Sequence, residues 1–121
     1  MRKKIVAGNW KMNKTFTEAA ALVVDLTDYQ SEFPKDVQVI IAPPALYLAS
    51  FQLMDNIGFE LSAQNCCDQD SGAYTGEISP AMLKAMDINY SIIGHSERRT
   101  YYGETNEVVK RKVDACLRNN V

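Results

Sequence analysis

The chain alternates strand-like and helix-like segments along its whole length, and this alternation limits the folds open to it. Short runs rich in valine and isoleucine predict strands, and longer runs with apolar residues at helical spacing predict helices. Strands that alternate with helices pair in parallel through right-handed crossovers. The predicted fold class is therefore α/β, with helices covering a parallel sheet. The four predicted strands are residues 4–9, 37–42, 59–64 and 90–94.

Four helices are expected between and after these strands. Thr15 with Glu18 three residues later fits a capping box, and Ser79-Pro80 fits an N-cap followed by a first helical residue. The helices are predicted at residues 17–31, in a short segment after Pro43-Pro44, at residues 80–86 and at residues 105–119. The expected apolar faces of the second and last helices are Leu46, Ala49 and Leu53, and Val109, Val113 and Cys116.

Length and composition are those of an ordinary globular domain. The 121 residues fit one domain, residues 1–121, with 46% hydrophobic and 23% charged residues. The formal net charge of -2 favours neither nucleic acid nor an anionic membrane as a partner. No apolar run approaches the roughly 20 residues of a membrane span. The basic start before Ile5 lacks the apolar region of a signal peptide, so it is interpreted as the first strand.

The three cysteines, Cys66, Cys67 and Cys116, do not suggest a disulfide framework. Their number is odd, two of them are adjacent, and there is no C-x-x-C motif for zinc. We therefore expect reduced thiols in a cytoplasmic protein, in core or loop positions.

Polar side chains follow the predicted strands at the edge where chemistry is usually found in parallel α/β proteins. Asn9 and Lys11 follow the first strand, and His95 and Glu97 follow the fourth, so the four residues are expected to converge. Lys11 suits a phosphate or a developing oxyanion, Asn9 and His95 can donate to a carbonyl, and Glu97 can hold Lys11 in an ion pair. Taken singly, the alternatives are a solvated loop lysine, a surface ion pair and a histidine that only caps a strand.

His95, the single histidine, has a further expected property. A helical turn over residues 96–98 would direct backbone N–H groups at the ring, which disfavours imidazolium. A neutral imidazole can act as an electrophile towards a carbonyl oxygen. The chain has no G-x-G-x-x-G after the first strand, no Walker A motif and no credible cluster of metal ligands, and Trp10 is interpreted as a packing residue.

Four sequence blocks resemble the triosephosphate isomerase family, and they occur in the family's order. They are residues 7–13, 63–65, 72–79 and 94–99, and the resemblance covers the whole chain. It implies a cofactor-free (β/α)₈ barrel enzyme, homodimeric in the family, without a metal. The implied reaction interconverts dihydroxyacetone phosphate and glyceraldehyde 3-phosphate through an enediolate, in glycolysis and gluconeogenesis.

The resemblance also implies roles for individual residues. Lys11 would bind the substrate and offset negative charge, and Asn9 would orient the substrate. His95 would polarise the carbonyl and move protons between two oxygens, and Glu97 would position Lys11. The loop that would reach into a neighbouring subunit and support its site consists of Tyr74, Thr75, Gly76 and Glu77.

Four βα units correspond to the N-terminal half, (β/α)₄, of such a barrel, which needs about 250 residues and eight strands. The family's catalytic glutamate, its closing lid and its glycine-rich phosphate donors belong to the other half. We therefore expect no isomerase activity from these 121 residues alone. Open edges at the first and fourth strands predict self-association or pairing with a complementary C-terminal half.

Two alternatives remain at this point. Beside the N-terminal half of such an isomerase, the chain could be an inactive half-barrel with a structural role, or a small flavodoxin-like domain with a ligand at its switch point.

Overall fold

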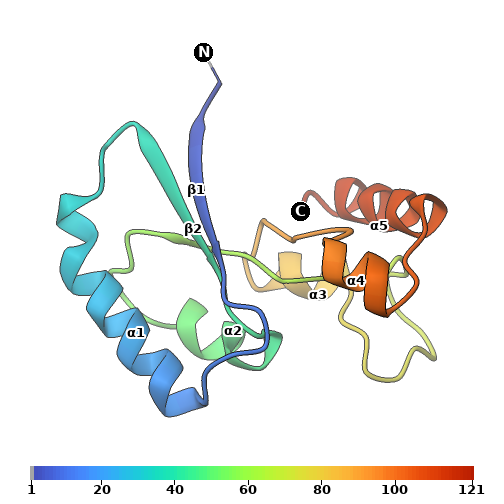
Figure 1. Ribbon diagram of the computed structural model, residues 1–121, viewed down its shortest axis with the longest axis horizontal. Helices are drawn as coiled ribbons and strands as arrows, with labels where there is room; N and C mark the ends of the chain where they lie inside the picture. The colour runs from blue at the N-terminus through green and yellow to red at the C-terminus, as the bar shows by residue number, and fades with distance from the viewer. Residues whose placement is uncertain (1) are drawn as a thin grey trace.

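The computed structural model describes residues 2–121 as parallel strands with helices packed beside them (Figure 1). β1 and β2 run side by side, with α1 and α2 on one side in the view and α3, α4 and α5 gathered on the other. The elements in chain order are β1 (Lys4–Asn9), α1 (Phe16–Tyr29), the 3₁₀ turn η1 (Gln30–Glu32), β2 (Val37–Ala42), α2 (Ala45–Gln52), β3 (Glu60–Leu61), α3 (Pro80–Ala85), α4 (Ser96–Tyr101) and α5 (Asn106–Arg118).

The sheet has three parallel strands in the order β1-β2-β3. β1 pairs with β2 in register from Lys4 opposite Val37 to Asn9 opposite Ala42, and β2 pairs with β3 at two positions. Both strands of the first pair have the predicted bounds. The parallel α/β class is confirmed, as an open half-barrel sheet.

The two later strands are shorter than predicted. β3 has two residues where six were expected, and the predicted fourth strand is a single parallel bridge between Ala63 and Ser91. Ala63 donates its N–H to the Tyr90 carbonyl at 2.9 Å and accepts from the Ile92 N–H at 2.9 Å. Two bonds around one residue do not propagate a ladder, and residues 90–93 are half-buried, so the prediction of a buried fourth strand was wrong.

Side-chain hydroxyls cap the starts of α1, α3 and α5. Thr15 accepts from the Glu18 N–H at 3.5 Å, as the first half of the predicted capping box requires. Ser79 accepts from the Met82 N–H at 3.1 Å, and Pro80 follows as the first residue of α3. Thr105 caps α5 in the same way. The helix starts predicted at Thr15 and Ser79 are confirmed.

The core lies between α1, α2 and the sheet, and it extends through the loop after β3 to α5. The predicted apolar face of α2 was wrong, because Leu46, Ala49 and Leu53 are all exposed, and that of α5 was partly wrong. Leu46 and Leu53 are 82% and 80% exposed, because α2 turns its aromatic face inward. α5 buries Lys112, with Val113 partly exposed, because the ammonium of Lys112 has polar partners inside. The core residues of α2 are Tyr47, Leu48 and Phe51, and those of α5 are Lys112, Ala115 and Cys116.

β1 is an edge strand of the sheet in residues 2–121, as predicted. Its apolar Ile5 and Val6 are 51% and 61% exposed. All three cysteines are free and buried, which agrees with the predicted core or loop positions. None of the helices between residues 2 and 121 is long and apolar enough to cross a membrane.

Candidate active site

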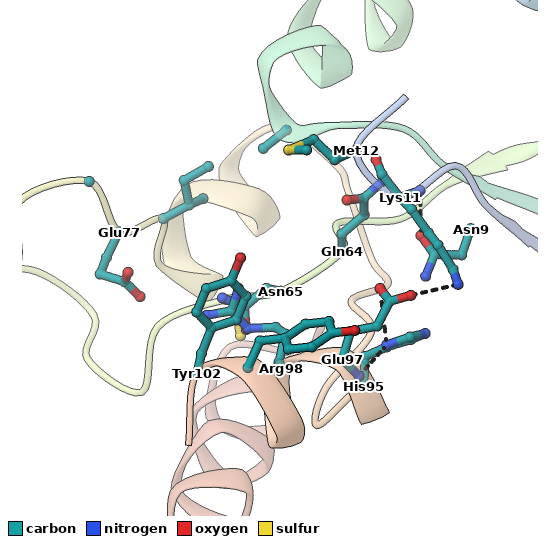
Figure 2. Close-up of a pocket in the computed structure, with 15 residues that line it drawn as sticks. Asn9, Lys11, Met12, Gln64, Asn65, Glu77, His95, Glu97, Arg98 and Tyr102 are labelled. Atoms are coloured by element: carbon teal, nitrogen blue, oxygen red, sulfur yellow. Dashed lines mark hydrogen bonds and ion pairs between the residues drawn. The ribbon is translucent and has the colours of Figure 1, made fainter. Parts of the chain in front are cut away.

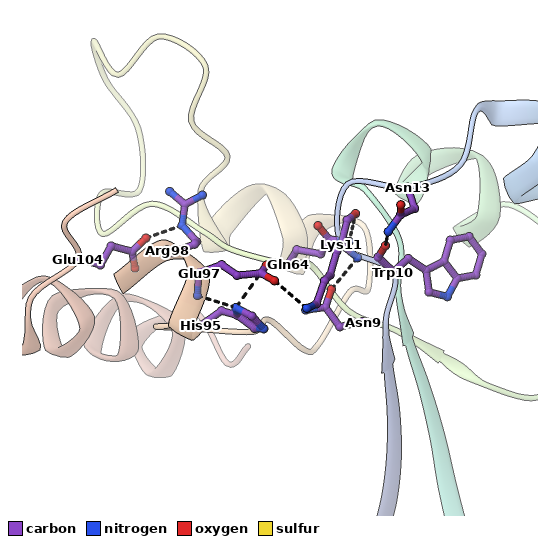
Figure 3. A network of polar contacts seen from close by, with 9 residues as sticks. All are labelled: Asn9, Trp10, Lys11, Asn13, Gln64, His95, Glu97, Arg98 and Glu104. Carbon is purple, nitrogen blue, oxygen red and sulfur yellow. Dashed lines mark hydrogen bonds and ion pairs between the residues drawn. The ribbon is translucent and has the colours of Figure 1, made fainter. Parts of the chain in front are cut away.

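Asn9 and Lys11 lie in the turn that leaves β1, and polar contacts hold this turn (Figure 3). The Asn9 Oδ1 accepts from the Lys11 backbone N–H at 2.9 Å. Lys11 has a φ of 56°, in the left-handed region that side-chain-bearing residues avoid. The Gln64 Nε2 donates to the Lys11 carbonyl at 2.9 Å and to the Ala42 carbonyl at 2.8 Å. These bonds tie the strained Lys11 backbone to the end of β2.

Lys11 reaches across to Glu97 in α4. Its Nζ lies 2.6 Å from Glu97 Oε1, so the ion pair expected from the sequence is present. The hydrogen bond from Lys11 holds the pKa of the Glu97 carboxyl below its usual value, and the positive charge of Lys11 adds to this. The pair links the turn after β1 to α4, because Lys11 and Glu97 come from these two segments and meet at the cavity (Figure 2).

His95 is the N-cap of α4, which begins at Ser96. Its Nδ1 accepts a hydrogen bond from the Glu97 backbone N–H at 3.1 Å, so the predicted turn does direct N–H groups at the ring. An Nδ1 that accepts carries no proton, and the neutral ring then has its proton on Nε2. The Glu97 Oε2 lies 3.6 Å from Nδ1. Nε2–H is therefore the donor that His95 offers to a ligand.

These side chains border one cavity of about 430 Å³. A lysine cation, a neutral imidazole donor and amide groups face the same space, which suits a small anionic molecule rich in oxygen. The structure brings together all four residues singled out from the sequence for chemistry. The polar and charged residues that line the cavity include Asn9, Lys11, Gln64, Asn65, Glu77, His95, Glu97 and Arg98 (Figure 2).

A buried ion-pair network behind the cavity was missed from the sequence. The Arg98 Nε donates to Glu104 Oε2, and the Lys112 Nζ lies 3.0 Å from the same oxygen and 2.9 Å from Asn65 Oδ1. Burial raises the pKa of Glu104, but hydrogen bonds from Lys112 and Arg98 outweigh it and bring that pKa below its usual value. The network thus fixes Arg98 and Asn65 in the cavity wall. The sequence did contain one sign of this network, because Lys112 stands at a position of α5 where the helical spacing calls for an apolar residue.

The loop predicted to contact a neighbouring subunit is exposed. The Glu77 N–H donates to the Tyr74 carbonyl at 3.0 Å, which closes a turn around Thr75 and Gly76. Gly76 and Glu77 border the cavity of their own chain. Figure 2 shows Glu77 on the side away from His95. Among residues 2–121 no group of three or more histidine, cysteine, aspartate or glutamate side chains is placed to hold a metal ion.

Comparison with known proteins gives one consistent family. The family model for triosephosphate isomerase matches residues 4–121. The triosephosphate isomerase of Bacteroides fragilis is 49% identical over 122 residues, which cover 100% of this chain and 49% of that protein.

Two further relatives agree. The triosephosphate isomerase of Cytophaga hutchinsonii is 45% identical over 100% of this chain and 49% of its own length. That of Chloroherpeton thalassium is 48% identical over 97% of this chain and 47% of its own length. The chain spans about half the length of the curated relatives that it matches. With a family match over residues 4–121, the chain belongs to the triosephosphate isomerase family.

Proposed function

We propose that the protein containing this chain interconverts dihydroxyacetone phosphate and glyceraldehyde 3-phosphate, and that these residues bind the substrate and polarise its carbonyl. The observation that carries the proposal is that Asn9, Lys11 and His95 border one cavity, with the His95 Nδ1 engaged as an acceptor. The names of the relatives support the reaction.

In the proposed reaction a base takes the proton from the carbon next to the carbonyl, and the electron pair forms the double bond of an enediolate. Negative charge then develops on the carbonyl oxygen. The Nε2–H of His95 is free to donate to that oxygen, because Nδ1 is occupied by the Glu97 N–H. The ring gives its proton to one oxygen and takes one from the neighbouring hydroxyl, which returns it to its starting state. The base then gives its proton to the carbon that carried the carbonyl, and the new carbonyl forms at the neighbouring carbon.

Lys11 supplies the positive charge in this proposal. Its ammonium offsets the negative charge of the substrate and of the developing oxyanion, and Asn9 orients the substrate. Glu97 acts as a positioning residue, because its carboxylate lies 2.6 Å from the Lys11 Nζ and its backbone N–H fixes the His95 ring.

The proposal places the carbon base outside these 121 residues. Glu97 is the carboxylate of the cavity wall nearest His95, and its pairing with Lys11 leaves it poorly suited to take a proton from carbon. Residues 1–121 are accordingly proposed as one half-barrel unit of four βα units, inactive on their own. Measurable turnover by the purified 121-residue chain would refute this part.

The activity is tested with the protein expressed from its complete coding sequence, by following triose phosphate isomerisation. Lys11→Ala should lower kcat/KM by about 10²–10³-fold, because it removes a charge that faces the oxyanion. Lys14→Ala is the matched control, since Lys14 lies three residues along, is exposed and is not part of the cavity wall. Equal activity of the Lys11 and Lys14 variants would contradict the proposed site.

We also propose that the turn of Tyr74, Thr75, Gly76 and Glu77 docks against a second subunit and supports its Asn9, Lys11 and His95. The exposure of this turn in the single chain supports the idea. Thr75→Arg should then shift sedimentation towards a smaller species and lower activity together. A variant that keeps the sedimentation of the parent would argue against docking.

The cytoplasmic location expected from the sequence stays a prediction.

A second candidate function is an inactive half-barrel that self-associates or pairs with a C-terminal half. The exposed Ile5 and Val6 on edge strand β1 favour it, because such an edge can accept another strand. Sedimentation of the 121-residue chain separates the outcomes. Association that grows with concentration supports this candidate, and a concentration-independent monomer contradicts it.

A further inference from the structure

Two buried cysteine sulfurs that have no part in the proposed reaction face each other across the fold. The Sγ of Cys66 lies 3.3 Å from the Sγ of Cys116, although the residues are 50 positions apart in the sequence. Cys66 is 1% exposed and Cys116 is 7% exposed. Cys66 follows β3, and Cys116 lies in the last turns of α5, so the contact joins two separate elements.

A row of polar contacts on either side holds these two elements together. The Lys112 Nζ donates to Asn65 Oδ1 at 2.9 Å on one side of the sulfur pair. The Arg111 Nε lies 2.9 Å from Asp68 Oδ2, and the Asn119 Nδ2 donates to Asp70 Oδ1 at 2.9 Å. Because these contacts flank the sulfurs, they limit how far the two cysteines can separate.

We propose that Cys66 and Cys116 form an oxidative modification site, at which a small peroxide converts the two thiols into a disulfide. The bond requires the sulfurs to approach from 3.3 Å to about 2.05 Å. That is a movement of roughly 1.2 Å, within reach of side-chain rotation. Cys67 offers no such partner, because its sulfur contacts Asp68 and the Gln69 N–H.

The reaction balances with hydrogen peroxide as the oxidant. The Cys116 sulfur attacks one peroxide oxygen, so that an S–O bond forms, the O–O bond breaks, and the departing hydroxide takes up the Cys116 thiol proton as water. The Cys66 sulfur then attacks the Cys116 sulfur, the S–S bond forms and the S–O bond breaks. The second water leaves with the proton of Cys66. Two thiols are oxidised by two electrons, and one peroxide is reduced to two waters.

The environment of the two cysteines supports attack by Cys116 first and by Cys66 second. Cys66 borders the cavity of about 430 Å³, which gives a molecule as small as peroxide a way towards the pair. The hydrogen bond from Cys66 lowers the pKa of the Cys116 thiol, which makes Cys116 the better nucleophile. The same contact and burial raise the pKa of Cys66.

Closing this bond would lock the segment after β3 onto α5. The unfolded chain then keeps a closed loop between residues 66 and 116, so its entropy falls and the folded state gains stability. The expected increase in Tm is on the order of 10 °C. Asn65, next to Cys66, would be held more firmly in the cavity wall.

The test uses the protein expressed from its complete coding sequence, treated with hydrogen peroxide and digested with trypsin without reductant. Cleavage at Lys35, Lys84, Lys112 and Arg118 separates residues 36–84 from residues 113–118. We expect these two peptides linked in the parent and in Cys67→Ala, and unlinked in Cys116→Ala and after dithiothreitol. Thermal unfolding of the oxidised parent should show the higher Tm, and oxidised Cys116→Ala should not.

Other results overturn the proposal. Thiols that stay reduced, a sulfinic acid without a link, or a link that disappears in Cys67→Ala would each show that Cys66 and Cys116 do not form the pair. The peptide map of the parent decides the question even if one variant fails to fold.

Discussion

Gly94, the residue before His95, should not tolerate a side chain, and a second glycine provides the control. Gly94 and Gly103 both have a φ of +65°. A Cβ added at Gly94 would lie 2.9 Å and 3.0 Å from the two methyl carbons of Val109 on α5, whereas a Cβ at Gly103 meets nothing within 4 Å. The pair of substitutions therefore separates backbone strain from steric overlap.

The expected magnitudes follow from this difference. Left-handed backbone costs a residue with a Cβ about 1–2 kcal/mol, and this applies equally to Gly94→Ala and Gly103→Ala. The effect of alanine on the unfolded chain also cancels between them. Overlap with Val109 adds about 1–3 kcal/mol to Gly94→Ala alone. We expect Gly94→Ala to lower the free energy of unfolding by about 2–5 kcal/mol.

Urea unfolding followed by circular dichroism, at one fixed protein concentration, measures these differences. The double variant Gly94→Ala/Val109→Ala should recover stability relative to the sum of the single variants, because the overlapping methyl groups are gone. If Gly94→Ala costs no more than Gly103→Ala, or if Val109→Ala gives no recovery, the steric reasoning is refuted.

Three further predictions concern buried charge and helix caps. Lys112→Met should lower the free energy of unfolding by about 3–5 kcal/mol in urea unfolding, because it leaves the buried Glu104 with one cation fewer. Lys110→Met, which removes an exposed pair on the same helix, should cost at most about 0.5 kcal/mol, and equal costs would contradict the network. Because the folded-state pKa of Glu104 lies below the ordinary 4.5, its stabilisation should be complete above pH 4.5 and lost as the pH falls through the folded value. Glu104→Gln should reduce that slope in unfolding measured against pH, and an unchanged slope would argue against it. Ser79→Ala should lower the free energy of unfolding by about 1 kcal/mol through loss of the α3 cap, with Ser79→Thr as the conservative control that keeps the capping hydroxyl.

The two long strands were predictable because their signal is local. Residues 4–9 and 37–42 carry apolar runs with clear boundaries, and the structure has β1 and β2 at those positions. The later strands depend on what lies beside them. Residues 59–64 meet β2 at two positions, and residues 90–94 meet their neighbour at one, so strand-like composition did not become a ladder.

Helix periodicity predicted that α2 and α5 form, but not which face is buried. Leu46 and Leu53 have the spacing of an apolar stripe, and yet the core takes Tyr47, Leu48 and Phe51. In α5 the decisive residue is Lys112, whose burial depends on Glu104 in the loop before the helix and on Asn65 in the segment after β3. Side-chain partners from other segments are not visible in a local pattern.

The positions of the site residues were predictable for the same reason as the fold class. The ends of parallel strands meet at one edge, and this edge carries Asn9, Lys11, His95 and Glu97. The hydrogen bond from Gln64 to the Lys11 carbonyl was not predictable, because no sequence pattern indicates that a lysine adopts a left-handed backbone conformation.

Steady-state isomerisation of glyceraldehyde 3-phosphate by the complete protein and its His95→Gln variant tests the central claim most directly. The glutamine side chain keeps an amide donor but cannot pass a proton between two oxygens, so we expect kcat to fall by about 10²–10⁴-fold with a much smaller change in KM. A folded parent protein without turnover, or a His95→Gln variant with unchanged kcat, would contradict the account.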